Sequence, residues 1–303
     1  MFDLIIIGGG PAGCAAAVYS ARKQLKTLLI LKEWGGQSIV SEDIQNWIGT
    51  PHISGVKLAE NLKAHVMEYK NKFVEIKDST YVTNISGADG NFSVTTDKGE
   101  TFNSRSVFIG TGSSRRKLEA INADKFEHKG VTYCASCDGP LFGGTDVVVI
   151  GGGNAGFESA SQLLAYCQSV TLLSRSEPRA EKITIEKLKS NPDFKLVINA
   201  IPKCVQGSQF VESITYTANN EDITLPCSGI FVEIGHVPAT GFVKDTVKLN
   251  EIGKIVINPR TQETSVKGIW SAGDCTDVLY HQNNIAVGDA VRAIEDIYLY
   301  LKA

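Results

Sequence analysis

The sequence predicts an α/β protein built around two βαβ units, each with a nucleotide-binding turn. Near the N-terminus, a glycine-rich turn at residues 8–13 stands between an apolar strand and an alanine-rich helix. The same arrangement returns at residues 151–156, so the two turns begin 143 residues apart, at Gly8 and Gly151. That offset is domain-sized, and the length of 303 residues corresponds to about two domains.

The first unit opens with an apolar segment at residues 3–7, which predicts a strand buried on both faces. A helix is expected to follow at 14–21 and a second strand at 27–31. Residues 54–69 predict another helix. Residues 72–109 alternate polar and apolar side chains, which predicts antiparallel strands.

The second unit repeats the pattern. A strand is expected at residues 146–150, a helix after the turn, and a second strand at 170–173. Alternating segments in the second half predict further antiparallel strands, at residues 194–199, 210–218, 222–225 and 228–234. A last strand is expected at 254–258 and a closing helix at 286–301. The glycine-containing turns 110–112 and 235–238 are the candidates for crossings between the domains.

Charge and composition exclude several classes of function. Lysine and arginine number 30 and the acidic residues 33, for a net charge of −3, whereas nucleic-acid binders show a basic excess or a basic block. No apolar run approaches the roughly 18 residues of a membrane span, and the N-terminus lacks the basic segment of a signal peptide. We therefore expect a cytoplasmic protein that binds neither nucleic acid nor membranes.

Seven cysteines exclude a complete set of internal disulfides, and two of them, Cys134 and Cys137, form a C-x-x-C pair. Such a pair in the cytosol indicates a reducible disulfide with redox chemistry. A zinc site usually needs a second cysteine pair or two histidines at ligand spacing, and the sequence offers neither, so no metal site is expected. Asp138 beside the pair is a candidate proton donor or acceptor, or alternatively a turn residue.

The residues that follow each second strand suggest the ligands of the two turns. Glu33 lies 25 residues beyond Gly8, where an acid can accept ribose hydroxyls, although a solvated surface glutamate is the alternative. In the second unit, Arg175 and Arg179 stand at the corresponding place, and arginines there favour the 2′-phosphate of NADP over NAD. Two ordinary surface arginines are the alternative. Asp274, after Gly273, can present a carboxylate to a polyol.

Together these residues resemble the low-molecular-weight thioredoxin reductase family of flavoproteins over essentially the whole chain. The motifs that carry the resemblance are residues 8–13, 35–37, Asn46, 111–112, 134–138, 151–156, 235–238 and 273–274. Residues 131–134, 137–142, 151–156 and 272–275 are also similar to the reductase portion of the flavoprotein subunit of bacterial alkyl hydroperoxide reductase.

The resemblance implies two Rossmann-like nucleotide-binding domains of the three-layer ββα type, the second inserted in the first. Residues 1–112 and 243–303 would bind FAD, and residues 113–242 would bind NADPH and carry the redox pair. Electrons would pass from NADPH through FAD and the Cys134–Cys137 disulfide to thioredoxin, or to a thioredoxin-like or glutaredoxin-like protein. The resemblance also orders the thiols: Cys137 faces the flavin, Cys134 attacks the partner, and Asp138 handles protons. It further implies a homodimer.

The site residues transferred by the resemblance fall into two sets. The expected FAD-binding residues are Gly8, Gly10, Pro11, Ala12, Gly13, Glu33, Gly36, Gln37, Asn46, Thr111, Gly112, Gly273, Asp274, His281 and Gln282. The expected NADP-binding residues are Gly151, Gly153, Asn154, Ala155, Gly156, Arg175 and Arg179.

Two departures from the family pattern leave the electron donor open. The family's NADPH segment carries a histidine and three arginines, whereas this chain has only Arg175 and Arg179, with Glu177 between them. Ser174 also stands where an NADH-specific relative has an acid. His281 replaces the usual arginine before Gln282. NADPH is the expected donor, with reduced ferredoxin, or NADH in a peroxiredoxin system, as alternatives.

Two other classes of function compete with a disulfide reductase. A flavin oxidase or a ferredoxin–nucleotide reductase needs no cysteine pair, so Cys134 and Cys137 argue against both. A non-enzymatic redox sensor has no positive support in the sequence, because no DNA-binding or partner-binding appendage is evident.

Overall fold

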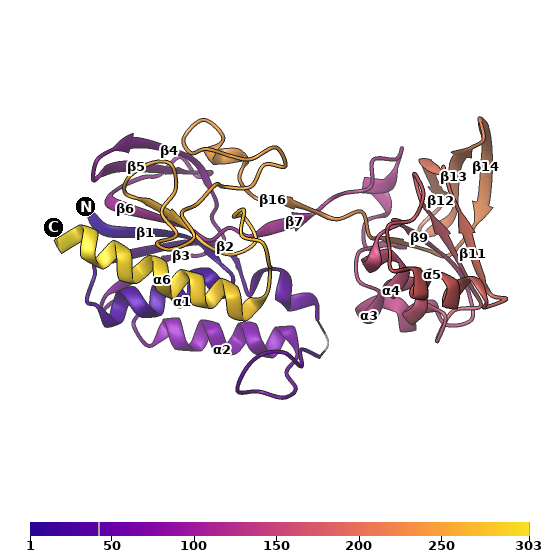
Figure 1. The fold of residues 1–303 in the computed structure, drawn as a ribbon, viewed down its shortest axis with the longest axis horizontal. Coiled ribbons are helices and arrows are strands. Elements are labelled where there is room, and N and C mark those ends of the chain that lie inside the picture. The colour runs from indigo at the N-terminus through magenta and orange to yellow at the C-terminus, as the bar shows by residue number, and fades with distance from the viewer. Residues whose placement is uncertain (42, 303) are drawn as a thin grey trace. The chain divides into compact units, whose positions relative to one another are not determined.

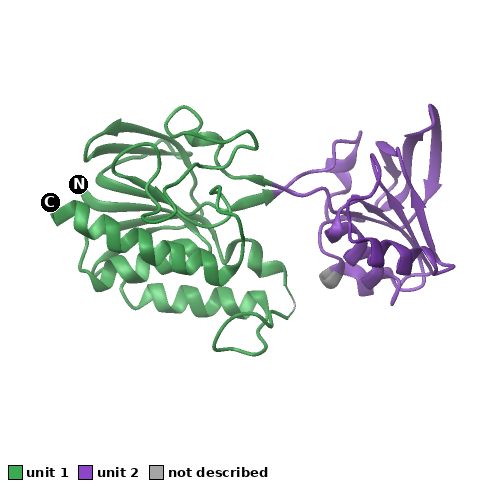
Figure 2. Cartoon of the chain, in the orientation of Figure 1, with its two compact units in different colours: residues 1–114, 237–303 green, residues 115–236 purple. Residues whose placement is uncertain are grey.

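The computed structural model describes residues 1–41 and 43–302, without the side chains of Ser136 and Cys137. The chain divides into two compact units (Figure 2). Unit 1 comprises residues 1–114 and 237–303, and unit 2 comprises residues 115–236. The second unit is therefore inserted in the first, and each is described by itself.

A parallel sheet forms the centre of unit 1. Its central strand β1 (Phe2–Gly9) pairs with β2 (Thr27–Trp34) on one side and β6 (Thr101–Ile109) on the other. The outer strands are β3 (Val74–Lys77), beside β2, and β17 (Ile269–Ser271), beside β6. The parallel order is thus β3-β2-β1-β6-β17. β1 is central because its side chains are apolar on both faces, and most of them are buried.

Three helices lie on one side of this sheet (Figure 1). They are α1 (Pro11–Arg22), α2 (Gly55–Met67) and α6 (Asn283–Lys302). Alanines of α1 and the side chains of Ile294 and Ile297 in α6 share one apolar core with the sheet. The short alanine side chains allow the helix backbones to approach closely.

The opposite side of the sheet carries a third layer. β4 (Val82–Ala88) and β5 (Asn91–Thr96) extend antiparallel from β6. Their apolar side chains share a second core with Val243 and Ile255 from the last third of the chain. Unit 1 therefore has the three layers expected of the fold class. Its short 3-10 helices are η1 (Gly36–Val40) and η4 (Gly241–Val243).

Unit 2 repeats the same parallel arrangement. β9 (Asp146–Ile150) is central, with β10 (Ser169–Leu173) and β11 (Phe194–Val197) on one side and β15 (Gly229–Val232) and β8 (Val131–Thr132) on the other. Its strand order, β11-β10-β9-β15-β8, corresponds position by position to that of unit 1. The internal repeat predicted from the glycine turns is therefore a repeat of the whole sheet.

The remaining elements of unit 2 surround this sheet. The helices are α3 (Ala135–Asp138), α4 (Asn154–Leu163) and α5 (Lys182–Lys189), with 3-10 helices η2 (Ala123–Phe126) and η3 (Gly139–Phe142). A separate antiparallel sheet consists of β12 (Ile201–Gly207), β13 (Val211–Ala218) and β14 (Glu221–Pro226).

Strand direction is where the sequence-based expectations fail. β3, β11 and β15 were expected to be antiparallel, but each lies parallel to its sheet neighbour. β6, expected likewise, is antiparallel to β5 but parallel to β1 and β17. Alternating polar and apolar side chains indicate a strand with one exposed face. A strand at the edge of a parallel sheet can also have an exposed face. The alternation therefore does not determine whether a strand is parallel or antiparallel to its neighbour. β15, whose four residues are all buried, shows no alternation in the structure.

Three further segments differ from expectation. Residues 254–258 form no continuous strand, only isolated bridges that pair Ile255 with Leu249 and Thr276, and Ile257 with Thr264. Hydrogen bonds to three separate segments interrupt the ladder. The strand β12 and the helix α5 were not anticipated.

The unit boundaries lie at 114/115 and 236/237, whereas the sequence placed them after residues 112 and 242. The difference arises because the segment after residue 236 is bonded into unit 1. Ala239 N donates to Gly112 O at 3.0 Å, and Thr111 Oγ1 donates to Ala239 O at 2.8 Å. The chain leaves and re-enters unit 1 along a two-stranded ribbon of β7 (Ser113–Arg115) and β16 (His236–Pro238).

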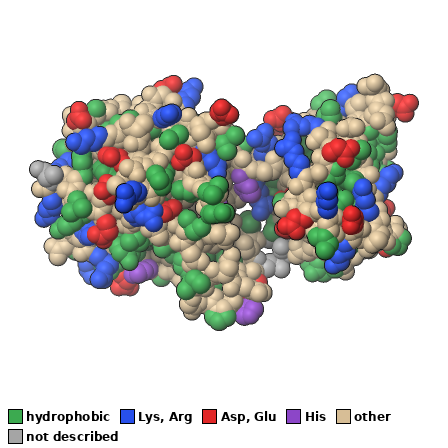
Figure 3. Space-filling model, viewed as in Figure 1, with side chains coloured by type: hydrophobic (Ala, Val, Ile, Leu, Met, Phe, Trp, Pro, Cys, Tyr) green, Lys and Arg blue, Asp and Glu red, His purple; other side chains and the backbone are tan. Residues whose placement is uncertain are grey.

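The surface of unit 1 shows no segregation of charge on the face seen in Figure 3, where acidic and basic side chains are interspersed. Among the helices that the structure describes, none is long and apolar enough to cross a membrane. Within the described residues there is also no group of three or more histidine, cysteine or acidic side chains that could hold a metal ion.

Candidate functional site

The first cavity, of about 400 Å³, lies in unit 1 at the carboxyl ends of β1, β2, β6 and β17. Ligands of open α/β sheets bind at this edge. Most expected FAD-binding residues line it: Gly8, Gly10, Pro11, Ala12, Glu33, Gly36, Gln37, Thr111, Gly112, Gly273 and Asp274. The topology therefore brings together residues that are up to 266 positions apart, between Gly8 and Asp274.

The glycine turn of unit 1 combines tight packing with one open position. A Cβ on Gly8, whose φ is +118°, would lie 2.2 Å from Gly110 O, and one on Gly13 would lie 1.8 Å from Gly8 O. Gly13 therefore packs α1 against the turn rather than lining the cavity. A Cβ on Gly10 would meet nothing closer than 3.9 Å. Gly10 also caps α1 without a side-chain hydrogen bond, so the first N–H groups of the helix are available to an anion.

Three of the four remaining expected FAD-binding residues, Asn46, His281 and Gln282, line a neighbouring cavity of about 510 Å³, which shares Asp274 with the first. Asn46 Nδ2 donates to Gln282 Oε1 at 3.0 Å, and Asn284 Nδ2 donates to Asn46 O at 2.7 Å. These bonds tie the loop around Asn46 to the start of α6. His281 lies in the same wall, beside Asp274.

Unit 2 has an equivalent cavity of about 540 Å³ at the carboxyl ends of β9, β10 and β15. Its lining includes the expected NADP-binding residues Gly151, Gly153, Asn154, Ala155, Arg175 and Arg179. The glycine geometry of unit 1 recurs, since a Cβ on Gly156 would lie 1.9 Å from Gly151 O while one on Gly153 would meet nothing within 4 Å. Gly153 also caps α4 without a side-chain bond.

The segment after β10 presents both arginines to solvent. Arg175, Glu177 and Arg179 are all exposed at the rim of this cavity. Arg179 N donates to Gly152 O at 2.8 Å, which joins this segment to the glycine turn. Ser174 is buried, and its hydroxyl donates to Ser176 O at 2.7 Å. The Ser174 hydroxyl therefore stabilises the conformation of this loop.

Sequence reasoning missed Glu233, a carboxylate in the wall of the unit 2 cavity. It follows β15, and Ser159 Oγ donates to its Oε1 at 2.8 Å. Burial raises the pKa of Glu233, while the hydrogen bond from Ser159 and the charge of Arg115 oppose the rise. A position directly after an apolar strand near a glycine turn is the signal that could have identified it.

The C-x-x-C segment lies at the start of α3 in unit 2. Cys134 is disulfide-bonded, whereas the side chain of Cys137 lies outside the described residues. The Asp138 carboxylate accepts a short hydrogen bond from the Thr132 hydroxyl. Asp138 N also donates to Cys134 O at 3.1 Å. Asp138 is thus held beside the cysteine pair by a residue, Thr132, that sequence reasoning did not single out.

The other five cysteines are free thiols, and four of them are buried. Burial raises the pKa of the Cys14 and Cys227 thiols to about 12 and that of Cys167 to about 11, and it also raises the pKa of Cys275. Since the thiolate is the reactive form, we expect these four thiols to be alkylated slowly near neutral pH. Only Cys204 is half-exposed among the five.

Alkylation of the native, oxidised protein with iodoacetamide at pH 8 is therefore expected to label at most one thiol, Cys204. After mild reduction, we expect labelling of Cys134 and Cys137 in addition, because a C-x-x-C disulfide is readily reduced. Peptide mass mapping measures this, with urea-unfolded protein as the control for full labelling. Labelling of Cys134 before reduction would contradict the disulfide.

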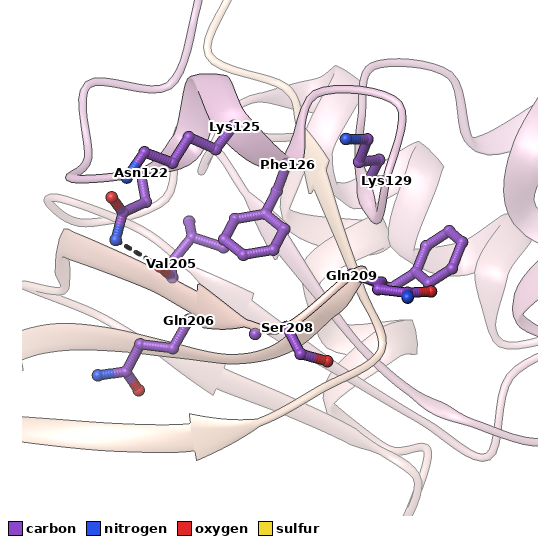
Figure 4. A pocket seen from close by; sticks show the side chains of 10 residues that line it. Asn122, Lys125, Phe126, Lys129, Val205, Gln206, Ser208 and Gln209 are labelled. Atoms are coloured by element: carbon purple, nitrogen blue, oxygen red, sulfur yellow. Dashed lines mark hydrogen bonds between the residues drawn. The ribbon is translucent and has the colours of Figure 1, made fainter.

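Unit 2 has another cavity, of about 710 Å³, and no residue of its glycine turn is in the lining; Figure 4 shows this cavity. Phe126 packs with Val205 of β12, and Lys125 and Lys129 also line the cavity. Asn122 Nδ2 donates to Val205 O at 3.4 Å. No sequence-predicted site residue lines this cavity, so its size does not make it the active site.

Comparison with known proteins agrees with this geometry. The model of the pyridine nucleotide-disulphide oxidoreductase family matches residues 2–290. The chain belongs to this family.

Two curated relatives are similar to this chain over nearly all of its length. The F subunit of the alkyl hydroperoxide reductase of Escherichia coli is 38% identical over 304 residues, which cover 99% of this chain and 58% of that protein. NADH dehydrogenase of Bacillus subtilis is 37% identical over 303 residues, with coverage of 99% and 58%. The chain therefore spans less than two thirds of the length of these relatives.

Solved structures of similar length include thioredoxin reductases. The enzyme of Lactococcus lactis superposes with a TM-score of 0.84 at 31% identity, covering 100% of this chain and 99% of the other. That of T. acidophilum gives a TM-score of 0.81 at 31% identity, with the same coverage. The resemblance to the thioredoxin reductase family and the fold class predicted from the sequence are confirmed.

The family implies FAD and a pyridine nucleotide, and the described residues fit two such ligands. Each unit has a glycine turn with one position, Gly10 or Gly153, where the structure leaves room for a ligand to approach the backbone. Each turn opens a helix whose first N–H groups have no side-chain cap. The two turns thus offer geometrically equivalent places that suit the pyrophosphate of a nucleotide.

Proposed function

We propose that this protein is an FAD-dependent disulfide reductase that uses NADPH to reduce thioredoxin or a thioredoxin-like protein. In the balanced reaction, NADPH and one proton convert a partner disulfide to a dithiol and release NADP⁺. The observation that carries the proposal is the disulfide-bonded Cys134 of the C-x-x-C, in the unit that also holds the second glycine turn. The cytoplasmic location and the homodimer stay predictions.

In this proposal, unit 1 holds FAD, which when bound supplies a two-electron redox centre between nucleotide and disulfide. The N–H groups at the start of α1 bind the pyrophosphate, Glu33 accepts ribose hydroxyls, and Asp274 accepts hydroxyls of the polyol chain. In unit 2, the N–H groups at the start of α4 bind the nucleotide's pyrophosphate. Arg175 and Arg179 are the candidates for its 2′-phosphate.

The cysteine pair performs the exchange with the partner. The Cys134 thiolate attacks a sulfur of the partner disulfide, and a mixed disulfide forms as the partner's other sulfur leaves. Cys137 then attacks Cys134 to release the reduced partner. Asp138, oriented by the Thr132 hydroxyl, exchanges the proton that the leaving thiolate requires. Steady-state oxidation of NADPH with purified thioredoxin tests the reaction.

A second candidate is the NADH-driven reduction of a peroxiredoxin system. The 38% identity to one component of an alkyl hydroperoxide reductase supports it, as does Glu177, which repels a 2′-phosphate at the rim of the cavity. Turnover with NADH and a peroxiredoxin-linked dithiol protein, but none with thioredoxin, would favour this candidate.

Replacement of Arg175 with alanine is expected to weaken NADPH binding by about tenfold or more, because one charge-assisted contact to the 2′-phosphate is lost. NADH, which lacks that phosphate, is expected to be unaffected. Anaerobic stopped-flow bleaching of the flavin band measures both donors. Lys182→Ala, an exposed cation outside the cavity lining, is the control. Flavin reduction by ferredoxin alone would overturn the choice of donor.

A further inference from the structure

We propose that Lys254 and His281 are positioning residues that hold the carboxylate of Asp274 at the wall shared by the two cavities of unit 1. Lys254 Nζ lies 2.5 Å from His281 Nε2, and His281 Nδ1 lies 3.4 Å from Asp274 Oδ1. The three side chains form a chain from ammonium through imidazole to carboxylate. Asp274 lines both cavities, so its orientation matters to any ligand there.

The chemistry of the lysine determines the protonation of the histidine. An ammonium group has three donors and no acceptor, so Nε2 of His281 must accept from Lys254. The ring is then neutral and carries its proton on Nδ1. Among the described residues, Nδ1 is one of few buried polar side-chain atoms that lack a hydrogen bond. The nearby acceptor for this proton is therefore Asp274, whose Oδ1 lies 3.4 Å from His281 Nδ1.

The backbone brings these residues together. Ile255 N donates to Cys275 O at 2.8 Å, and Asp277 N donates to Ile255 O at 3.0 Å, which places Lys254 beside the turn that carries Asp274. Lys254 N also donates to Asn250 Oδ1 at 2.9 Å. The other acid in the same cavity wall, Asp43, is already paired with His52 at 2.9 Å. Asp274 is thus the carboxylate within reach of His281.

An acid held in this way has one oxygen facing a donor and the other available to ligand hydroxyls. The ligand assignment, a polyol such as the ribityl chain of FAD, rests on the proposed function. The chain of contacts from Lys254 through His281 to Asp274 does not, because it involves only residues of this protein. Its protonation can therefore be measured without any ligand.

The first test is the tautomer of His281 in FAD-free protein labelled with ¹⁵N-histidine, measured by NMR at pH 8. The signal among the five histidines is assigned by its loss in His281→Asn. We expect a neutral ring protonated on Nδ1, and loss of this preference in Lys254→Met. A ring protonated on Nε2, or on both nitrogens, in the unmodified protein would overturn the proposal.

The second test compares two replacements of His281 that retain opposite halves of the ring. Asparagine retains a donor at the Nδ1 position, and glutamine retains a group near Nε2. We expect His281→Gln and Lys254→Met to lower FAD affinity by roughly three- to tenfold, and His281→Asn by less than about twofold. Equal losses in the two His281 variants would overturn the positioning role. If the unmodified protein binds no FAD, the proposed function fails, while the tautomer measurement still decides whether Lys254 sets the protonation of His281.

Discussion

Replacing Cys134 with serine is expected to lower thioredoxin reduction by roughly a thousandfold or more, because the attacking thiolate is lost. Cys137→Ser is expected to cause the same loss, since the mixed disulfide can no longer be resolved. Both variants are expected to retain FAD, because the expected FAD-binding residues all belong to unit 1 and the pair belongs to unit 2. Thioredoxin-coupled oxidation of NADPH and the flavin absorbance measure the two properties.

Cys204→Ser is the matched control for this pair. Cys204 lies in β12 of the same unit, is half-exposed, and is a free thiol. We expect its replacement to leave the turnover unchanged. Full activity of Cys134→Ser would exclude the dithiol mechanism and support a flavin oxidase or a ferredoxin–nucleotide reductase, neither of which needs the pair.

The second large effect is expected at Gly10, where an added methyl group enters open space. Gly10 has a φ of −78°, and a Cβ added there would meet no atom closer than 3.9 Å, so Gly10→Ala is expected to leave the stability of the FAD-free protein unchanged. A methyl group there occupies the place where a pyrophosphate approaches the backbone. We therefore expect FAD affinity to fall by about tenfold or more.

Gly13→Ala provides the contrast within the same turn. Its Cβ would lie 1.8 Å from Gly8 O, so the backbone must move, and we expect unit 1 to lose about 3 kcal/mol or more of stability. Thermal unfolding of the FAD-free proteins, together with flavin retention, separates a lost ligand site from a lost fold. Equal destabilisation of the Gly10→Ala and Gly13→Ala variants would contradict the conclusion that a methyl group at Gly10 enters open space.

The corresponding change in unit 2 tests the assignment of cofactors to turns. Gly153→Ala is expected to lower the affinity for the pyridine nucleotide by about tenfold and to leave FAD retention unchanged. The reason is that Gly153 lies in the equivalent open position of the second turn. Loss of FAD in the Gly153 variant, with normal FAD in the Gly10 variant, would mean that the two assignments are reversed.

Much of the candidate site was predictable because its groups are neighbours in the chain. The strand, turn and helix of each βαβ unit are contiguous, so the glycine positions and the helix starts follow from local sequence. The pair Cys134 and Cys137, with Asp138 beside it, is local in the same way. Repetition of this pattern after 143 residues was enough to predict two similar units, and the strand orders confirm the repeat.

Strand direction and several site residues depended instead on contacts between distant segments. The side-chain patterns of β3, β11 and β15 are compatible with both parallel and antiparallel pairing. These strands are parallel to their neighbours because of the way the chain crosses over between them. Lys254 meets His281 from 27 residues away. Glu233 reaches the second cavity only because β15 pairs with β9.

By itself the sequence determined the two glycine turns and their helices, since backbone sterics and short-range hydrogen bonding specify these locally. The tertiary structure alone decided which distant side chains line a cavity and which residues contact them there. Asn46 bonds Gln282, Ser159 bonds Glu233, and Lys254 contacts His281. Each such pair depends on sheet pairing and core packing summed over a whole unit, so no local pattern encodes it.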